Sequence, residues 1–94
     1  MAEFIRVAGR KIGDIRIFAL STCGWCKKTK KFFNDNGIAY SYIDVDTLPA
    51  SEADRVVKEQ AKYNPGGSFP TIVINSKQCI VGYDEARLKE LIGA

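Results

Sequence analysis

The chain has 94 residues, of which 46% are hydrophobic and 27% charged, and its formal net charge is +3. This length fits one compact domain without a second core, so we treat residues 1–94 as a single domain. No apolar run approaches the roughly 20 residues of a membrane helix. The mild charge argues against nucleic-acid binding, and the first residues lack the apolar segment of a signal peptide. We therefore expect a soluble cytoplasmic protein.

The first half of the chain predicts a strand, a helix and a second strand. Residues 15–20 are mostly apolar and bounded by turn residues, which indicates a central strand. A helical pattern covers residues 24–36 and stops at Asn36-Gly37. Residues 38–46 alternate between apolar and polar side chains, as strands do. This order and spacing predict a parallel unit with a right-handed crossover.

The second half predicts a helix, a hairpin and a last helix. Ser51 followed by Asp54 resembles a capping box and predicts a helix that starts at Ser51 and ends near Tyr63. Two β-branched runs at residues 70–74 and 78–81 predict an antiparallel hairpin. Asp84 is a candidate N-cap for the final helix.

These elements predict an α/β fold with a central four-stranded mixed sheet and three flanking helices. Residues 1–13 precede this pattern as an N-terminal extension, in which residues 4–11 are a candidate edge strand around Ala8-Gly9. No internal repeat or low-complexity tract is present.

The segment with the clearest chemistry joins the first predicted strand to the first helix, where Cys23 and Cys26 lie three residues apart. Cα atoms at positions i and i+3 of a helix start lie roughly 5 to 6 Å apart, which a disulfide can bridge. Unsatisfied N–H groups at a helix N-terminus favour a thiolate over a thiol. We therefore predict that Cys23 is a nucleophile and that Cys26 resolves the mixed disulfide it forms.

A Cys-x-x-Cys pair also occurs as half of a zinc site. Zinc in a structural site takes four ligands, and this chain offers no histidine and only one further cysteine, Cys79. We therefore expect no bound metal. Cys79 lies in an alternating strand and is interpreted as a small buried hydrophobic residue, with regulation or glutathionylation as the alternative.

The residues resemble the glutaredoxin family of the thioredoxin-like superfamily over residues 15–92. The matching pieces are Thr22-Cys23-Gly24-Trp25-Cys26, Tyr42-Ile43-Asp44-Val45-Asp46, Phe69-Pro70-Thr71 and Gly82-Tyr83-Asp84-Glu85. The resemblance implies a thioredoxin-like fold. It also implies a substrate or glutathione site that includes Thr22, Trp25, Phe69, Pro70, Tyr83 and Asp84.

Within that site, the resemblance implies that Pro70 follows a cis peptide bond and packs against the cysteines. It leaves the backbone of Phe69 free to pair with a peptide or glutathione. An ordinary trans proline is the alternative, since most X–Pro bonds are trans. Tyr83 and Asp84 look like the family's site for a glutathione carboxylate, and Asp84 as a plain N-cap is compatible with that role.

Three positions depart from the family pattern. Leu20 stands where many members carry lysine, and Val81-Gly82 replaces a common Gly-Gly pair. Both changes weaken a glutathione pocket. Trp25 replaces the proline-containing pairs between the cysteines, and it is interpreted either as a stacking surface for substrates or as a partly exposed aromatic residue.

Charged residues near the motif have two interpretations. Four lysines follow the cysteines and form a solvated helix face or attract an acidic partner; they are Lys27, Lys28, Lys30 and Lys31. Asp44 and Asp46 are interpreted as polar groups of the solvent face and strand end, without a catalytic role.

The sequence thus predicts a monomeric thiol-disulfide oxidoreductase that reduces protein disulfides without a bound cofactor. Its reductant would be glutathione, another low-molecular-weight thiol, or a reductase. One alternative is a dimeric carrier of a [2Fe-2S] cluster, since relatives with a glycine-aromatic pair between the cysteines include such proteins. Another is a dedicated electron donor that a thioredoxin-reductase-type enzyme reduces.

Overall fold

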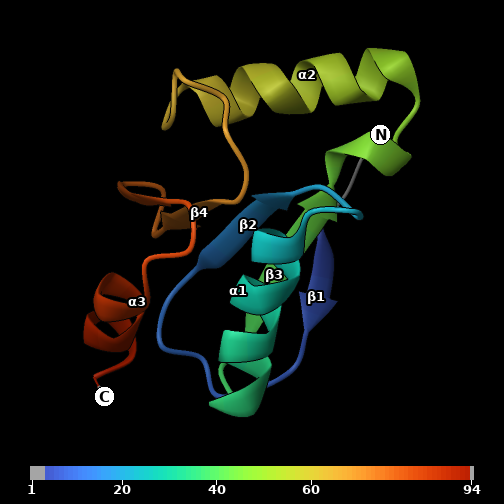
Figure 1. Cartoon of the computed structure of the whole chain (residues 1–94). Coiled ribbons are helices and arrows are strands. Elements are labelled where there is room, and N and C mark those ends of the chain that lie inside the picture. Colours follow the sequence, from blue (N-terminus) through green and yellow to red (C-terminus); the bar gives the residue numbers. More distant parts are fainter. Residues whose placement is uncertain (1–3, 94) are drawn as a thin grey trace.

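The computed structural model describes residues 4–93 and contains one five-stranded mixed sheet with helices on both faces (Figure 1). The strand order is β1-β3-β2-β4-β5. The strands are β1 (Ile5–Val7), β2 (Ile15–Ala19), β3 (Tyr40–Asp44), β4 (Thr71–Ile74) and β5 (Gln78–Val81). The helices are α1 (Gly24–Asp35), the 3-10 helix η1 (Val45–Thr47), α2 (Ala50–Ala61) and α3 (Glu85–Ile92).

The strand directions follow from the connections between the strands. β2 and β3 are parallel, with Ile17 opposite Tyr42, and α1 makes the crossover between them. Parallel neighbours need such a long connection, whereas antiparallel neighbours can be joined by a tight turn. β4 is antiparallel to β2 and to β5. The predicted thioredoxin-like α/β fold is therefore confirmed.

Side chains of β2 alternate between two apolar layers, because successive residues of a strand face opposite sides of the sheet. Ile17 belongs to a buried cluster with Cys26 and Phe33 of α1 and Leu88 of α3. Phe18 belongs to a second cluster with Ile43 and Val73, against which Val56 of α2 packs. Helices α1 and α3 thus cover one face, and α2 lies over the other, across one end of the molecule (Figure 1).

The N-terminal extension supplies the fifth strand, as an antiparallel partner of β3. The strand covers Ile5–Val7, so the predicted centre at Ala8-Gly9 was wrong by a few residues. A Cβ atom on Gly9 would lie 2.6 Å from the N of Ala39, so Gly9 lets the backbone pass close to the end of α1. Residues 1–3 of the extension lie outside the described residues.

The helix boundaries confirm two of the predicted signals and overturn one. Asp84 caps α3 by accepting a hydrogen bond from the N–H of Arg87 at 3.2 Å. Helix α1 ends just before Asn36, and Gly37 takes a φ of 64°. The capping box at Ser51 was wrong, because α2 begins one residue earlier, with Pro49 at its N-cap position. Pro49 directs the chain into α2 with extended backbone, which leaves Ser51 inside the first turn.

The predicted hairpin is confirmed as β4 and β5, with Ile72 opposite Ile80. Its turn places Asn75 and Ser76 at φ values of 53° and 55°. Two consecutive positive φ angles match the twist of the flanking strands. Among the helices of residues 4–93, none is both long enough and apolar enough to cross a membrane.

Candidate active site

Cys23 occupies the N-cap position of α1, at the carboxyl end of the central strand β2. Its Sγ accepts a hydrogen bond from the backbone N–H of Cys26 at 3.2 Å. Amide groups of a first helical turn have no partner within the helix, so they are available to a sulfur at the N-cap. Cys23 is half-buried and can therefore meet another molecule.

Cys26 is fully buried beneath Cys23 on the inner side of α1. Burial and, next in size, the side-chain hydrogen bond with Cys23 together raise the pKa of the Cys26 thiol to about 12. Cys26 thus keeps its proton at neutral pH while both cysteines are free thiols. The two neighbouring cysteines consequently differ in exposure, and the buried one is held as a thiol.

Trp25 and Tyr83 meet beside the cysteines, although 58 positions separate them in the sequence. The two rings stack with centroids 5.9 Å apart and planes inclined at 21°. The Nζ of Lys28 lies 5.3 Å from the centroid of each ring. Trp25 remains 59% exposed. The structure therefore brings together the predicted site residues Trp25 and Tyr83 and places Lys28 beside them. The sequence did not distinguish Lys28 from the neighbouring lysines.

Phe69 and Pro70 form the loop between α2 and β4, and the peptide bond between them is cis, as the resemblance implied. Pro70 is buried and Phe69 is half-buried. Among the turn and loop hydrogen bonds of residues 4–93, none uses the N–H or carbonyl of Phe69. That backbone is therefore available to an extended partner chain.

A buried polar network holds this loop against α2. The Nε2 of Gln60 donates to the carbonyl of Ser68 at 2.9 Å and to the Oγ1 of Thr71 at 3.0 Å. The Nδ2 of Asn64 also donates to Thr71 Oγ1, at 3.0 Å. Sequence reasoning missed this network, although a glutamine on the apolar face of α2 was a signal for it.

Two further predicted site residues, Thr22 and Asp84, make no hydrogen bond with the side chain of either cysteine within the described residues. Thr22 is exposed in the loop before Cys23. Asp84 is half-buried and acts as the N-cap of α3. Its carboxylate therefore already has a structural role, and its predicted contact with glutathione stays a prediction.

The profile of the Glutaredoxin family matches residues 15–79 of this sequence. The chain belongs to the glutaredoxin family. It is 40% identical to the glutaredoxin of Methanosarcina mazei Go1, with a TM-score of 0.87 over 99% of this chain and 90% of that one. It is 41% identical to the methanoredoxin of Methanosarcina acetivorans, with a TM-score of 0.88 over 92% and 90%.

A curated relative of this glutaredoxin is the uncharacterized glutaredoxin-like 8.6 kDa protein in the rubredoxin operon of Clostridium pasteurianum. The two are 32% identical over 79 residues, which is 83% of this chain and 96% of the relative. The family match includes the cysteines and Pro70 but excludes Tyr83, Asp84 and the N-terminal extension.

Two carboxylates near the end of β3 make specific contacts in this glutaredoxin; Asp46 is exposed, as expected for a strand end, whereas Asp44 is half-buried. Asp46 accepts hydrogen bonds from the N–H of Ser21 at 2.8 Å and from its Oγ at 2.5 Å. These bonds lower the pKa of Asp46. Asp44 pairs with Lys30 at 3.0 Å, and both side chains are only 18% exposed. Neither contact had a signal in the sequence, because each joins residues at least 14 positions apart.

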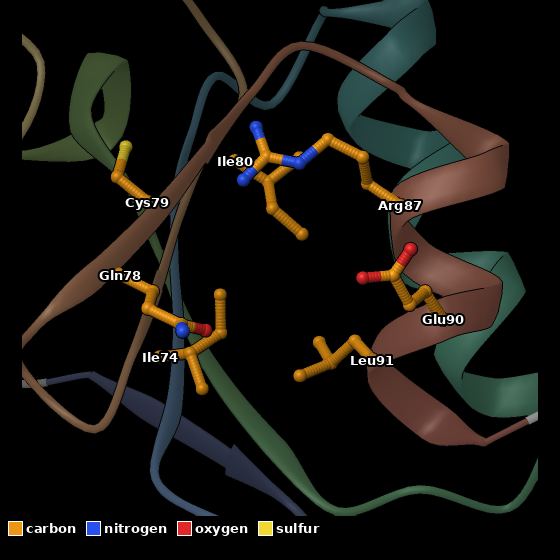
Figure 2. Close-up of a pocket in the computed structure, with 7 residues that line it drawn as sticks. All are labelled: Ile74, Gln78, Cys79, Ile80, Arg87, Glu90 and Leu91. Carbon is orange, nitrogen blue, oxygen red and sulfur yellow. The ribbon is translucent and has the colours of Figure 1, made fainter.

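The third cysteine lies on the outer strand β5 and is half-buried, so the expected full burial of Cys79 was wrong. An edge strand has no neighbour on one side, which leaves its side chains partly open. Burial raises the pKa of the Cys79 thiol, while the charge of Arg87 opposes this. A hollow of about 400 Å³ lies between β5 and α3. In Figure 2 the Cys79 sulfur points to the other side of β5 from this hollow.

Among residues 4–93, no group of three or more histidine, cysteine, aspartate or glutamate side chains is arranged to hold a metal ion. A [2Fe-2S] cluster would therefore need thiolates from a second copy of the chain and from added thiols. The cluster-carrier alternative and the monomeric state both stay predictions.

Proposed function

We propose that this glutaredoxin is a thiol-disulfide oxidoreductase that works through a reversible Cys23–Cys26 disulfide. The observation that carries the proposal is the hydrogen bond from the Cys26 N–H to the Cys23 sulfur at the helix start. The N–H that reaches the Cys23 sulfur belongs to Cys26, whose own thiol stays protonated directly behind it. Disulfide exchange in two steps requires an accessible sulfur that attacks first and a second sulfur within reach of it.

In the first step the Cys23 thiolate attacks one sulfur of a substrate disulfide. A mixed disulfide with Cys23 forms, and the other substrate sulfur leaves as a thiolate. In the second step Cys26 loses its proton, attacks the Cys23 sulfur and expels the second substrate thiolate. The substrate gains two electrons, and the protein is left with the Cys23–Cys26 disulfide.

The high pKa of Cys26 keeps its sulfur protonated before a mixed disulfide has formed. The raised value depends first on burial and then on the hydrogen bond with Cys23. Formation of the mixed disulfide removes negative charge from Cys23, so the electrostatic repulsion against a Cys26 thiolate falls. Cys26 thus becomes easier to ionise at the stage when its attack is needed.

Substrates would bind across three neighbouring features of the site. The unpaired backbone of Phe69 can hydrogen-bond to an extended peptide. The exposed Trp25 ring offers a stacking surface beside Cys23. Thr22 and Asp84 would contact glutathione if it is the reductant. A protein disulfide in an extended segment fits this arrangement.

The two cysteine substitutions test the order of the steps. Cys26→Ser should accumulate a mixed disulfide with substrate, visible by mass spectrometry, because no thiol remains to expel it. Cys23→Ser should form no adduct and should lose dithiol turnover. Adducts on Cys26 in the Cys23→Ser protein, at the yield seen on Cys23, would reverse the proposed roles.

The reductant is identified by a separate measurement. Oxidised protein is incubated with glutathione, with a small non-glutathione thiol, or with thioredoxin reductase and NADPH, and free thiols are then counted. Two recovered thiols per chain identify the donor. Because Leu20 and Val81 weaken the family's glutathione pocket, we expect glutathione to be slower than at least one other donor. Faster reduction by glutathione than by both others would contradict that expectation.

A further inference from the structure

The N-terminal extension builds a second concave surface at the end of the molecule opposite to the cysteines. A cleft of about 900 Å³ is bounded by β1, the loop that follows it, and the starts of β2 and β3. The loop is fixed to the far end of α1 by hydrogen bonds between Arg10 and Gly37 at 2.7 Å and between Ala39 and Arg10 at 2.9 Å. Figure 1 shows this loop near the far end of α1, away from the start of that helix.

This cleft is separate from the cysteine site. Helix α1 has 12 residues and begins at Gly24, directly after Cys23, so its two ends lie about 18 Å apart. The extension also precedes residue 15, where the family match begins. The cleft is therefore built partly from residues outside the family match and does not include the cysteines.

The lining of the cleft is strongly basic. Three cations line it, Arg6, Lys11 and Arg16, and Asp14 is the carboxylate that lines it with them. Asp14 lies 3.6 Å from the Nε of Arg16 and thus compensates one of the three charges. Within residues 4–93, no ion pair involves Arg6 or Lys11. Two positive charges are therefore left to attract an anionic partner.

The strand register places two of these cations, Arg6 and Arg16, in one row across the sheet. Arg6 lies opposite Ser41, and Ser41 lies opposite Arg16, so the two arginines share one face of the sheet two strands apart. Strands are about 4.8 Å apart, which separates the two arginine Cα atoms by about 10 Å. An extended chain covers this distance in about three residues.

The guanidinium group of Arg16 is held by contacts within the chain. It lies 5.7 Å from the Phe4 ring centroid and 5.9 Å from that of Tyr63. Its Nη2 donates to the Oγ of Ser76 at 3.2 Å, toward the β4–β5 turn. A single phosphate would need donors that converge on one point, whereas these cations are spaced apart.

We propose that the cleft is a docking site for an acidic, extended segment of a partner protein. One carboxylate of the segment would face Arg6 and another would face Lys11, the two cations without an ion pair among the described residues. A carboxylate about three residues from the first would make a weaker contact with Arg16, which Asp14 partly neutralises. A partner held there leaves Cys23 open to a disulfide. The basic extension would thus recruit a partner, and the cysteine end would carry out the exchange.

The test measures binding of a fluorescein-labelled serine octapeptide with aspartate at positions 1, 4 and 7 to the full chain by anisotropy. Arg6→Gln combined with Lys11→Gln should weaken binding roughly tenfold, since each exposed charge contact contributes up to about fivefold. The matched control combines Arg55→Gln with Lys58→Gln, which removes the same charge from the exposed surface of α2. The control should bind within twofold of wild type.

Amide chemical shifts locate the bound peptide independently of the variants. Shifts should cluster at Gly9, Lys11 and Ser41. An equal loss in both double variants, shifts centred elsewhere, or no peptide binding would overturn the proposal and leave the basic residues as protection of the β1 edge. Tighter binding of inorganic pyrophosphate than of the peptide would also overturn it, in favour of a small anion. Turnover of a small disulfide, measured in parallel, should be unchanged in both double variants.

Discussion

The helix-start cysteines and Cys79 place the same chemical group in two different surroundings. Cys23 caps a helix and accepts an N–H hydrogen bond, whereas Cys79 lies on an edge strand, where burial raises its pKa. Cys26 is buried as deeply as any core residue but lies within reach of Cys23. Position on the fold, rather than residue type, therefore sets the different surroundings of the three sulfurs, and we expect it to determine which of them reacts first.

The largest expected effect is on turnover. Cys23→Ser should lower disulfide reduction by about 10³-fold or more, because loss of a nucleophile removes the covalent route. Cys79→Ser should stay within about twofold of wild type, since Cys79 has no place in the exchange. Steady-state rates with a small disulfide test both variants. A Cys79→Ser protein as impaired as Cys23→Ser would invalidate the comparison.

The second effect concerns the buried thiol and alkaline pH. The pKa of Cys26 is raised from an ordinary value of 9.0 to about 12 in the folded, reduced protein. The folded state thus retains a proton that the unfolded state releases, so this contribution is complete below pH 9 and is lost between pH 9 and 12. The slope is about 1.4 kcal/mol per pH unit.

Urea unfolding at pH 8 and pH 10.5 measures this loss in the reduced protein. Cys26→Ala provides the control, because it lacks the thiol but keeps the other groups that titrate in this range. Wild type should lose more stability than Cys26→Ala between the two pH values. An equal loss in the two proteins would show that Cys26 titrates normally.

The stacked rings of Trp25 and Tyr83 should have a smaller effect on stability. Among the described residues, no stacked ring pair that includes a neighbour of Cys79 is found. Trp25→Ala and Tyr83→Ala each remove one of the stacked rings. In a double-mutant cycle their coupling should be about 0.5–1.5 kcal/mol of unfolding free energy. Strictly additive losses would show that the rings are adjacent without stabilising each other.

The smallest expected effect concerns the support of the cysteine loop. Asp46→Asn weakens the bonds to Ser21, and we expect turnover to fall about two- to fivefold, the range for exposed charged contacts. Asp35→Asn, at the other end of α1, serves as the control. A loss of the same size in Asp35→Asn would argue for a general charge effect.

The pKa of Asp46 supplies a second readout of this contact. It is lowered, chiefly by the hydrogen bonds from Ser21, so the ionised contact is complete above the ordinary range of a carboxyl group. It is lost only as the pH falls through the lowered pKa. The amide shift of Ser21 followed by NMR should titrate in that acidic range, and a midpoint at the ordinary value would contradict the contact.

Local patterns in the sequence were sufficient for the elements that depend on neighbouring residues. The Cys23–Cys26 spacing, the cap at Asp84 and the β4–β5 turn are each determined within a few residues. Local patterns did not determine the start of α2. Ser51 and Pro49 both suit a helix start, and the path of the chain decides between them.

Long-range contacts explain what the sequence did not reveal about the site. Asp46 reaches Ser21 across 25 positions, and Gln60 reaches Thr71 across 11. The partial exposure of Cys79 depends on β5 being an outer strand, which only the sheet order shows. The basic cleft likewise appears only once β1 pairs with β3 and aligns Arg6 with Arg16.

The most direct test of the comparison is competitive alkylation of the reduced protein at pH 7. A limiting amount of iodoacetamide is added, and the label on each cysteine is measured by peptide mass spectrometry over time. The N-cap position of Cys23 predicts that it is labelled at least about tenfold faster than Cys26 and Cys79. Labelling of Cys79 or Cys26 at the rate of Cys23 would contradict the assignment of Cys23 as the nucleophile.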